Sequence, residues 1–307
     1  MTTDMAPSGD IANLTYTCCQ YGDHALQRVG IWQHASPQGQ PGVSSGHWVI
    51  FIHGGAWRDP RNTLEDFMPS IKHMLSSHDI AQFALRGFVS IDYRLSPYAD
   101  FPQDPAEAHS PELRRARHPD HILDVRAALK FLESEYQLAK DYVLVGHSAG
   151  ATLAYQLLMG EAALAGQRMP QTVPLPAAVI GISGIYDLVG LNNRHGGNYA
   201  GFISAAFGTD QKAWQRASPA SFAGSIKENW PGSPYSLLAH SAEDSLIDSL
   251  ETESMAAKLA KDGVDLSVVK DLTGEHDFVW QDGSQVARLV AQVLERLAQA
   301  PGQLCNH

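Results

Sequence analysis

The sequence predicts an α/β protein in which helices cover both faces of a mostly parallel central sheet. Short runs of apolar, β-branched and aromatic residues alternate with segments whose apolar residues are spaced three and four apart. Such alternation is typical of a parallel sheet with helical crossovers. The chain has 307 residues, of which 44% are hydrophobic, so it is long enough to bury this sheet as one domain over residues 1–307.

The expected elements follow from these patterns in chain order. Residues 1–46 are expected to form an N-terminal edge segment with one or two antiparallel strands, and 36–46, rich in Pro, Gly and Ser, a surface loop. The central strands are expected at 48–53, 88–93, 141–145, 177–182, 235–239 and 266–272. The helices are expected at 67–76, 121–136, 151–159, 250–261 and 285–297.

Two segments interrupt the alternation of strands and helices. Residues 95–119 hold four prolines before position 112, and residues 187–234 mix glycine, asparagine and aromatic residues. Long insertions at the carboxyl ends of parallel strands lie over the ligand crevice, so we expect both segments to be lids or pocket walls. The aromatic side chains of 187–234 suit an aromatic substrate and the core of a small cap equally well.

Charge and cysteine content narrow the range of partners. The formal net charge of −11 disfavours nucleic acid and anionic membranes, which would repel such a surface. Three cysteines, Cys18, Cys19 and Cys305, do not make a disulfide framework. Residues 1–14 lack the pattern of a signal peptide, and no apolar run approaches the length of a membrane span. We therefore expect a soluble protein in the reducing cytoplasm.

The segment Gly146-His-Ser-Ala-Gly150 has the pattern of a nucleophile elbow. It follows an apolar strand and precedes an amphipathic helix, which places Ser148 on a sharp turn between them. The flanking glycines suit a turn whose neighbours have almost no room for side chains. Serine is also a common turn former, but the strand and helix context favours Ser148 as a nucleophile.

A serine hydroxyl needs a base to take its proton and a carboxylate to orient that base. In the chain order that accompanies an elbow, the acid comes next and the histidine last. Asp244 follows the predicted strand 235–239, and His276 follows the predicted strand 266–272. Both lie where loops converge on the carboxyl edge of the sheet, so we predict that Asp244 and His276 are the partners of Ser148.

Other carboxylates and imidazoles lie within a few positions of these residues: Glu243, Asp248, Asp277, His240 and His147. Asp244 is favoured because it lies in a polar turn four residues after His240, which closes the strand, whereas Asp248 has the position of an N-cap for the following helix. His276 is favoured over His240 because His240 closes the strand directly before the acid. The alternative readings are a simple turn residue for Asp244 and a solvated loop residue for His276.

The segment Ile52-His53-Gly54-Gly55-Ala56-Trp57 supplies the third component of this chemistry. Consecutive glycines after a strand leave backbone N–H groups free, and an oxyanion requires preorganised donors. The predicted donors are the amides of Gly55 and Ala56, with Ala149 as the third. Trp57 could form a wall of the pocket or pack beneath the loop, and packing is favoured.

Two further patterns concern structure and cofactors. Asn62 with Glu65, or Thr63 with Asp66, has the spacing of a helix capping box that would fix this loop. No histidine pair has zinc-site spacing with a third ligand, and no glycine-rich phosphate loop or dinucleotide fingerprint is present. We therefore expect neither a metal nor a cofactor.

Taken together, these motifs resemble the fungal kynurenine formamidases (arylformamidases), members of the α/β-hydrolase superfamily with a His-Gly-Gly-x-Trp motif. The most specific agreement covers residues 53–63, which read His-Gly-Gly-Ala-Trp-Arg-Asp-Pro-Arg-Asn-Thr. The agreement continues, in order, at 92–97, 146–150, 181–187, 240–244 and 274–276. The variable segments 99–117 and 192–229 lie outside the strong match.

The resemblance implies an α/β-hydrolase fold with small cap insertions at about 95–119 and 187–234. It further implies hydrolysis of N-formyl-L-kynurenine to L-kynurenine and formate, in tryptophan degradation towards NAD, by a homodimer. By motif, Ser148, Asp244 and His276 would be the catalytic triad, and the amides of Gly55 and Ala56 the oxyanion hole. Two alternatives remain: a carboxylesterase acting on short acyl esters, which shares every catalytic part, and a catalytically silent hydrolase fold used as a binding module.

Overall fold

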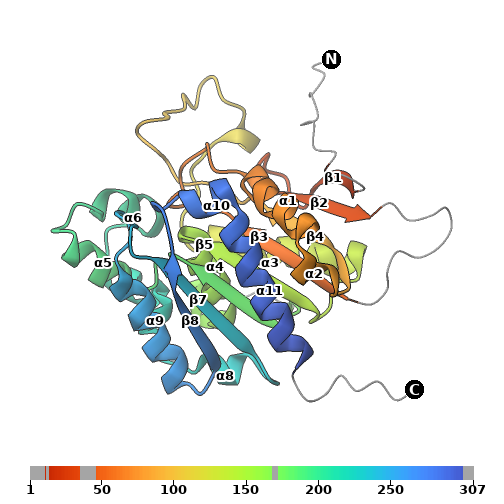
Figure 1. Cartoon of the computed structure of the whole chain (residues 1–307). Helices are drawn as coiled ribbons and strands as arrows, with labels where there is room; N and C mark the ends of the chain where they lie inside the picture. Colours follow the sequence, from red (N-terminus) through yellow and green to blue (C-terminus); the bar gives the residue numbers. More distant parts are fainter. Residues whose placement is uncertain (1–10, 12–13, 35–45, 168–171, 300–307) are drawn as a thin grey trace.

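The computed structural model describes residues 11, 14–34, 46–167 and 172–299. In these ranges one eight-stranded sheet has the order β1-β2-β4-β3-β5-β6-β7-β8 (Figure 1). The strands are β1 (Leu14–Gln20), β2 (Arg28–His34), β3 (His47–Ile52), β4 (Leu85–Ile91), β5 (Tyr142–His147), β6 (Ala178–Ile182), β7 (Tyr235–Ser241) and β8 (Asp265–Leu272). β2 runs antiparallel to both of its neighbours, β1 and β4, and the other neighbouring strands pair in parallel, which confirms the predicted fold class and its antiparallel edge.

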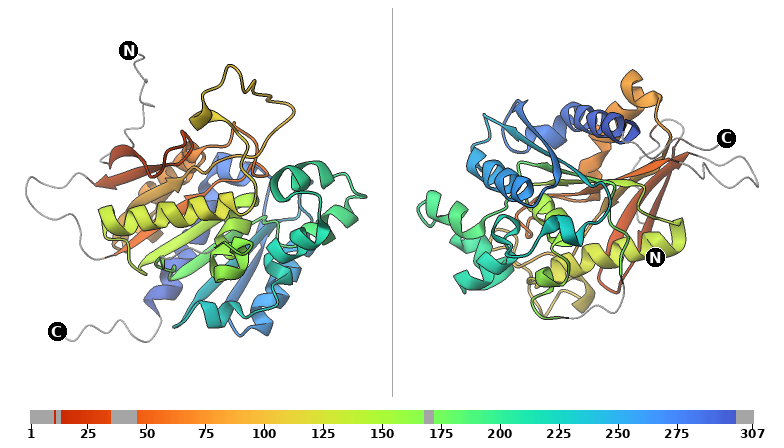
Figure 2. Two further views of the ribbon diagram at one scale, coloured as in Figure 1. Left: turned by 180° about the vertical axis from the view of Figure 1, so that it is seen from behind. Right: turned by 90° about the horizontal axis from the view of Figure 1, so that it is seen from below.

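Helices cover both faces of the sheet, as Figure 2 shows from two further directions. One face is covered by α1 (Met68–Ser76) and α11 (Ser284–Ala298), and the other by α3 (Asp120–Tyr136), α4 (Ala149–Leu158) and α9 (Ser249–Lys261). The shorter helices α2 (His78–Ala81) and α10 (Phe278–Asp282) adjoin the first group. No helix within the described ranges is long and apolar enough to cross a bilayer.

Side chains of the central strands alternate between two hydrophobic cores. In β3, Val49 and Phe51 join the core beneath α1 and α11, whereas Ile50 and Ile52 join the core beneath α3 and α4. Alternation with a period of two follows from strand geometry, and burial on both faces explains why β3 is apolar at nearly every position.

The two irregular segments of the sequence differ in structure. Residues 95–119 contain only the short 3-10 helix η2 (Ser110–Glu112), whereas 187–234 fold into a group of short helices: α5 (Leu188–Arg194), α6 (Ala200–Phe207), α7 (Gln211–Ala217), η4 (Pro219–Ser221) and α8 (Ile226–Asn229). The two segments meet where the His118 amide donates to the Ala206 carbonyl at 2.7 Å. Trp214 and Trp230 are buried, so part of the aromatic content of 187–234 fills a core.

The boundaries of the expected elements agree closely with the structure. β4 begins at Leu85, three residues before the predicted strand, and the other central strands and the five expected helices begin and end within two residues of prediction. The expected loop at 36–46 lies outside the described residues except for Gly46, as do Cys305 and most of residues 1–13.

Candidate active site

Ser148 lies on a strained turn between β5 and α4. Its φ of 52° and ψ of −119° fall outside the regions favoured by a residue with a side chain. The Ser148 amide donates to the Ile182 carbonyl of β6 at 2.9 Å, and only 4% of the residue is exposed. The sharp turn predicted from the motif is therefore present.

Glycines on both sides of Ser148 allow close backbone packing. A Cβ atom at Gly146 would lie 2.5 Å from the Gly150 carbonyl oxygen, and one at Gly150 would lie 2.1 Å from the Ile52 oxygen. Both distances are shorter than real Cβ contacts, so a side chain at either position would displace backbone. The approach at Gly150 places the end of β3 directly against the elbow.

Asp244 and His276 form a buried hydrogen-bonded pair. The Nδ1–H of His276 donates to Oδ2 of Asp244 at 2.8 Å. The second carboxylate oxygen accepts from the amides of Leu246 and Ile247 at 3.0 and 2.9 Å. Burial by itself raises the pKa of Asp244, but the contact with His276, helped by the Ile247 amide, outweighs burial and lowers the pKa to about 2. Asp244 is thus ionised at neutral pH, and it fixes the tautomer and orientation of the imidazole.

Further hydrogen bonds connect the loop that carries Asp244 to the loop that carries His276. The Ser241 hydroxyl donates to the Gly274 carbonyl at 2.7 Å, and the Gly274 amide donates to the Glu243 carboxylate at 2.9 Å. The hydroxyl of Ser245 donates to Glu275 at 2.7 Å. Glu243, one of the competing carboxylates, therefore binds backbone of the histidine loop.

The remaining competing residues have other contacts. Asp248 caps α9 by accepting from the Leu250 amide at 3.0 Å, which confirms its expected N-cap position. His240 lies within β7, one residue before its end, and burial lowers the pKa of its imidazole. Asp277 accepts from the indole N–H of Trp280 at 3.1 Å and is exposed.

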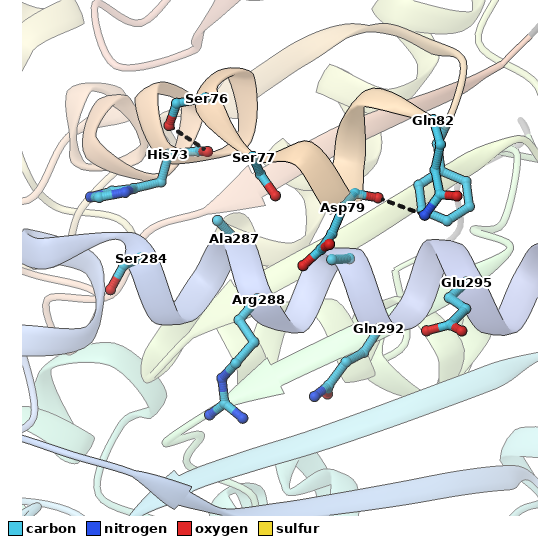
Figure 3. Close-up of a pocket in the computed structure, with 12 residues that line it drawn as sticks. His73, Ser76, Ser77, Asp79, Gln82, Ser284, Ala287, Arg288, Gln292 and Glu295 are labelled. Carbon is cyan, nitrogen blue, oxygen red and sulfur yellow. Dashed lines mark hydrogen bonds between the residues drawn. The ribbon is translucent and has the colours of Figure 1, made fainter.

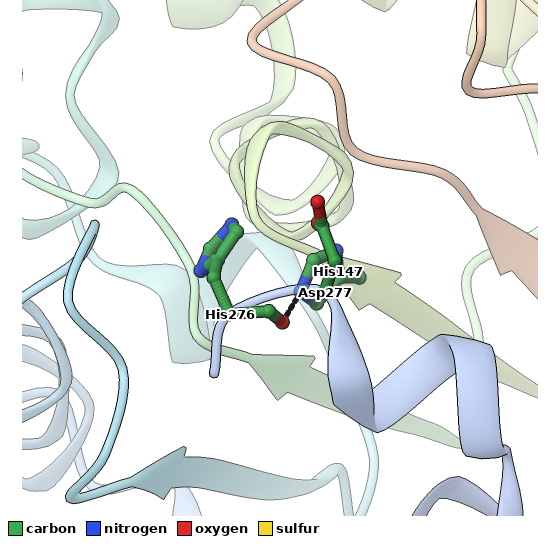
Figure 4. Close-up of side chains that lie close together, drawn as sticks. All are labelled: His147, His276 and Asp277. Carbon is green, nitrogen blue, oxygen red and sulfur yellow. Dashed lines mark hydrogen bonds between the residues drawn. The ribbon is translucent and has the colours of Figure 1, made fainter. Parts of the chain in front are cut away.

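His147 connects the elbow to the histidine loop, a role that the sequence did not suggest. Its Nε2–H donates to the backbone carbonyl of His276 at 3.0 Å, and the two rings lie 4.6 Å apart (Figure 4). Burial, together with electrostatic repulsion between the neighbouring imidazoles of His147 and His276, lowers the pKa of His147 to about 3, so its imidazole is neutral at neutral pH. Since His147 directly precedes Ser148, this bond brings the backbone of the two predicted catalytic residues together.

The loop after β3 presents free amides beside the elbow. Gly55, Ala56 and Trp57 all have positive φ, at 84°, 49° and 60°. A Cβ atom at Gly54 would lie 3.1 Å from Cβ of Ser148, so the loop lies against the serine. The amides of Gly55, Ala56 and Ala149 donate to no residue in the described part of the chain. Unpaired amides of this kind are the donors that an oxyanion requires.

Buried residues beneath this loop hold it in place. The Tyr93 hydroxyl lies 3.1 and 3.0 Å from the carbonyl oxygens of His53 and Gly54, to which it donates. The His53 ring stacks on Tyr93 with centroids 4.5 Å apart, and its Nε2 lies 3.5 Å from Asp92. Arg28 binds the other oxygen of Asp92 at 2.6 Å. His53 is therefore a structural support of the loop and is shielded from solvent.

Trp57 packs under the cap, as the favoured reading expected. It is fully buried, and its ring lies 4.9 Å from Phe207 in a T-shaped arrangement.

The predicted capping box is wrong in detail. Thr63 does cap the 3-10 helix η1 (Leu64–Phe67), but its hydroxyl accepts from the Glu65 amide, and the Asp66 carboxylate accepts from the side chain of Asn62.

The nearest approach to a metal-ligand set in the described ranges consists of His147, His276 and Asp277, whose ligand atoms lie within 4.8 Å of one another (Figure 4). Both imidazoles already bind protein groups through one nitrogen each. These hydrogen bonds account for the placement of the rings, and the expectation of a metal-free site stays a prediction.

Comparison with known proteins is consistent with this geometry. Residues 49–280 match the family model described as α/β hydrolase fold. The chain is 34% identical to a kynurenine formamidase-like hydrolase of Fusarium equiseti over 88% of this chain and 90% of that protein. It is 35% identical to a kynurenine formamidase of Aspergillus versicolor, over 76% of this chain and 84% of that protein.

Solved structures with the same fold include esterases. Esterase B of Lactobacillus rhamnosis in an inhibited form superposes with a TM-score of 0.67 at 16% identity, covering 94% of this chain and 87% of that one. An esterase/lipase from an uncultured bacterium gives a TM-score of 0.60 at 19% identity, covering 94% and 86%. At these identities the likeness concerns the fold alone.

Proposed function

Because the chain belongs to the kynurenine formamidase family of α/β hydrolases, we propose that it hydrolyses N-formyl-L-kynurenine to L-kynurenine and formate. The observation that carries the proposal is the 2.8 Å hydrogen bond between His276 and Asp244, in a loop joined to the elbow of Ser148. A base oriented by an ionised carboxylate beside a strained serine is the arrangement that acyl transfer requires.

In the proposed mechanism, His276 removes the proton from the Ser148 hydroxyl as its oxygen attacks the formyl carbon. Asp244 accepts the Nδ1–H of His276, which leaves Nε2 as the base, and it stabilises the imidazolium that forms. The C=O double bond opens and its oxygen becomes an oxyanion. This charge is bound by the free amides of Gly55, Ala56 and Ala149, and one such donor is worth about 3 kcal/mol in other serine hydrolases.

The tetrahedral intermediate then collapses and the C–N bond breaks. The aryl amine takes the proton from His276 as it leaves, and the formyl group remains on Ser148. Water, deprotonated by His276, attacks this ester, and formate leaves while the serine regains its proton. An aryl amine is a better leaving group than an alkyl amine, which suits a serine site that uses no metal. Within this proposal the enzyme acts in tryptophan degradation towards NAD, and as a homodimer.

A carboxylesterase acting on short acyl esters is the second candidate, because esterases are among the proteins that share this fold and would use the same catalytic groups. Comparison of kcat/KM for N-formyl-L-kynurenine and p-nitrophenyl acetate separates the two, because specificity is a ratio of these values. The proposal predicts that the formamide, followed through the absorbance of kynurenine, is the better substrate. If the ester is preferred by orders of magnitude, the formamidase assignment fails.

The remaining alternative is a hydrolase fold that binds ligands without turnover. A fluorophosphonate probe reacts only with an activated serine, so labelling of the native protein, and none of Ser148→Ala, would exclude a silent site. Failure of the native protein to label would support it.

A further inference from the structure

A cavity of about 680 Å³ lies between the segment 97–115 and helix α6. Tyr98 and Phe101 line it from the first segment, and Gly201 and Ala205 from the helix. Arg58, from the loop that follows the free amides, completes one side. The cavity therefore lies between the two irregular segments and is bordered by the loop of the proposed oxyanion donors.

Arginines supply the charge of this cavity. Arg58, Arg114 and Arg115 line it, and none of the described residues that line it carries a carboxylate. No carboxylate of the described residues lies within 4.0 Å of these guanidinium groups. In a chain with a net charge of −11, a cavity with unneutralised positive charge stands out. Its charge is complementary to an anionic ligand.

Arg114 is held rigidly but lacks a counter-charge. Its terminal nitrogen donates to the Phe101 carbonyl at 2.5 Å, and its backbone amide donates to the Gln103 side chain at 2.7 Å. Its buried Nε has no acceptor among the described residues. Burial also lowers the pKa of Arg114, which records that the charge is partly desolvated without compensation.

Arg58 lies against the aromatic wall of the same cavity. Its guanidinium carbon is 4.2 Å from the ring centroid of Tyr98 and 5.7 Å from that of Phe202. The nearby carboxylate of Asp59 is already bound by Arg61 at 2.6 Å. Since consecutive Cα atoms are about 3.8 Å apart, those of Arg58 and Ala56 are separated by at most about 7.6 Å. Arg58 therefore connects the loop of the proposed oxyanion donors to one wall of the cavity.

A second cavity, whose described residues include no arginine without a counter-charge, provides a comparison. It has about 730 Å³, lies between α1, α2 and α11, and is lined by residues of both charges, among them Asp79, Arg288 and Glu295 (Figure 3). Arg288 is neutralised by Asp271 at 2.8 Å. Among its described residues, this groove therefore offers no free arginine to an anionic ligand.

We propose that the cavity beside α6 binds the carboxylate end of an aromatic formamide substrate, with Arg114 and Arg58 as its charged partners. Guanidinium groups bind carboxylates through paired hydrogen bonds, and the rings of Tyr98 and Phe101 give an aromatic substrate apolar contact. The inference rests on the proposed function and adds to it a selection rule: the enzyme prefers anionic aryl formamides over neutral ones.

The kinetic test compares N-formyl-L-kynurenine with formanilide, which has no carboxylate. In Arg114→Gln the ratio of kcat/KM for the two substrates falls about 10- to 100-fold, the usual loss for a hydrogen bond to a charged group. Arg114→Lys, which keeps the charge, retains more of the ratio than Arg114→Gln. Arg58→Gln also lowers the ratio of kcat/KM for the two substrates. Equal losses on both substrates, or no loss on either, would overturn the proposal.

The matched control is Arg117→Gln. Arg117 is exposed, lies in the irregular segment 95–119 and does not line the cavity, so its substitution leaves the ratio within about twofold of the native value. Melting temperatures of all variants establish that each is folded.

A binding measurement separates failure of this inference from failure of the proposed function. Benzoylpropionate and its neutral amide contain no formyl group, so isothermal titration calorimetry with them needs no turnover. The native protein binds the acid at least about tenfold more tightly than the amide, and Arg114→Gln removes the difference. Equal binding of the two by the native protein contradicts the carboxylate site, whatever the enzyme hydrolyses. A protein that prefers the acid but does not turn over N-formyl-L-kynurenine retains the site and loses the proposed function.

Discussion

The imidazole of His147 donates a hydrogen bond of 3.0 Å to the backbone carbonyl of His276. These residues are 129 positions apart in the chain, and the bond joins the residue before the proposed nucleophile to the proposed base. The neighbouring loops are joined as well, because Gly274 binds both Ser241 and Glu243. The histidine loop is therefore held through the backbone of Gly274 and the carbonyl of His276, in addition to the contact of the His276 ring with Asp244.

Substitution of His147 tests whether this tether positions the base. His147→Phe keeps the volume of a ring but removes the donor, so we expect kcat to fall about 3- to 10-fold, the net value of one hydrogen bond, with KM nearly unchanged. His147→Gln can still donate and retains more activity. Steady-state kinetics of both variants provide the measurement, and equal activity of the two would show that the hydrogen bond is irrelevant.

Asp244 and Asp248 form a matched pair of carboxylates for testing the acid. Asp244→Asn leaves an amide in contact with Nδ1 of His276 and favours the wrong tautomer, so kcat falls by about a thousandfold or more. Asp248→Asn changes the cap of α9 and the contacts of Asp248 with Arg194 and His195, and activity stays within about threefold of the native value. Comparable losses in the two variants would remove Asp244 from the catalytic group.

Gly150 tests the close approach of β3 to the elbow. Gly150→Ala places a Cβ atom 2.1 Å from the Ile52 carbonyl oxygen, which forces backbone apart. We expect a loss of at least about 2 kcal/mol in the free energy of unfolding, as for other overpacked cores. Gly201→Ala in α6 meets nothing within 4 Å and should be neutral or stabilise by up to about 1 kcal/mol. Urea denaturation measures both values; a Gly150→Ala protein as stable as the native one contradicts the packing.

Buried His121 makes stability depend on pH. Burial, with the charges of His118 and Arg94, lowers the pKa of His121 from 6.5 to about 3. Between these values the unfolded chain binds a proton that the folded protein does not. The contribution of neutral His121 to the free energy of unfolding is therefore fully present above pH 6.5. It is lost as the pH falls towards 3, by at most about 1.4 kcal/mol per pH unit.

His121→Gln, which can keep the hydrogen bond to Ser96, should reduce the loss of stability between pH 7 and pH 5. His109→Gln, an exposed position, should leave it unchanged. Urea denaturation at the two pH values gives the comparison. If His121→Gln loses as much stability on acidification as the native protein, the imidazole does not titrate as its burial requires.

Long buried elements could be predicted from the sequence because their apolar periodicity is strong. The strand β4 begins earlier than predicted because Leu85-Arg86-Gly87 carries a charge and a glycine, which give no strand signal. The helices α5 to α8 could not be predicted, since helices of four to eight residues are too short for periodicity to show. Their formation depends on side-chain caps such as Asp187 and Asp210 and on packing against the rest of the cap.

Some contacts of the candidate site could likewise be predicted from the sequence, and others could not. Chain order and spacing predicted that Asp244 and His276 would meet, and the structure brings them into hydrogen-bond contact, while their catalytic roles stay predictions. The role of His147 and the support of the loop by Tyr93 were missed. Each depends on a contact between residues distant in the sequence, 129 and about 40 positions apart, for which no local pattern exists.

The most direct test of the proposed mechanism is the rate of N-formyl-L-kynurenine hydrolysis by Ser148→Ala beside the native protein. We expect the native protein to produce kynurenine and formate and the variant, with an unchanged melting temperature, to lose at least about a thousandfold in kcat. Undiminished turnover by the folded variant would contradict the assignment of Ser148 as the nucleophile and the mechanism built on it.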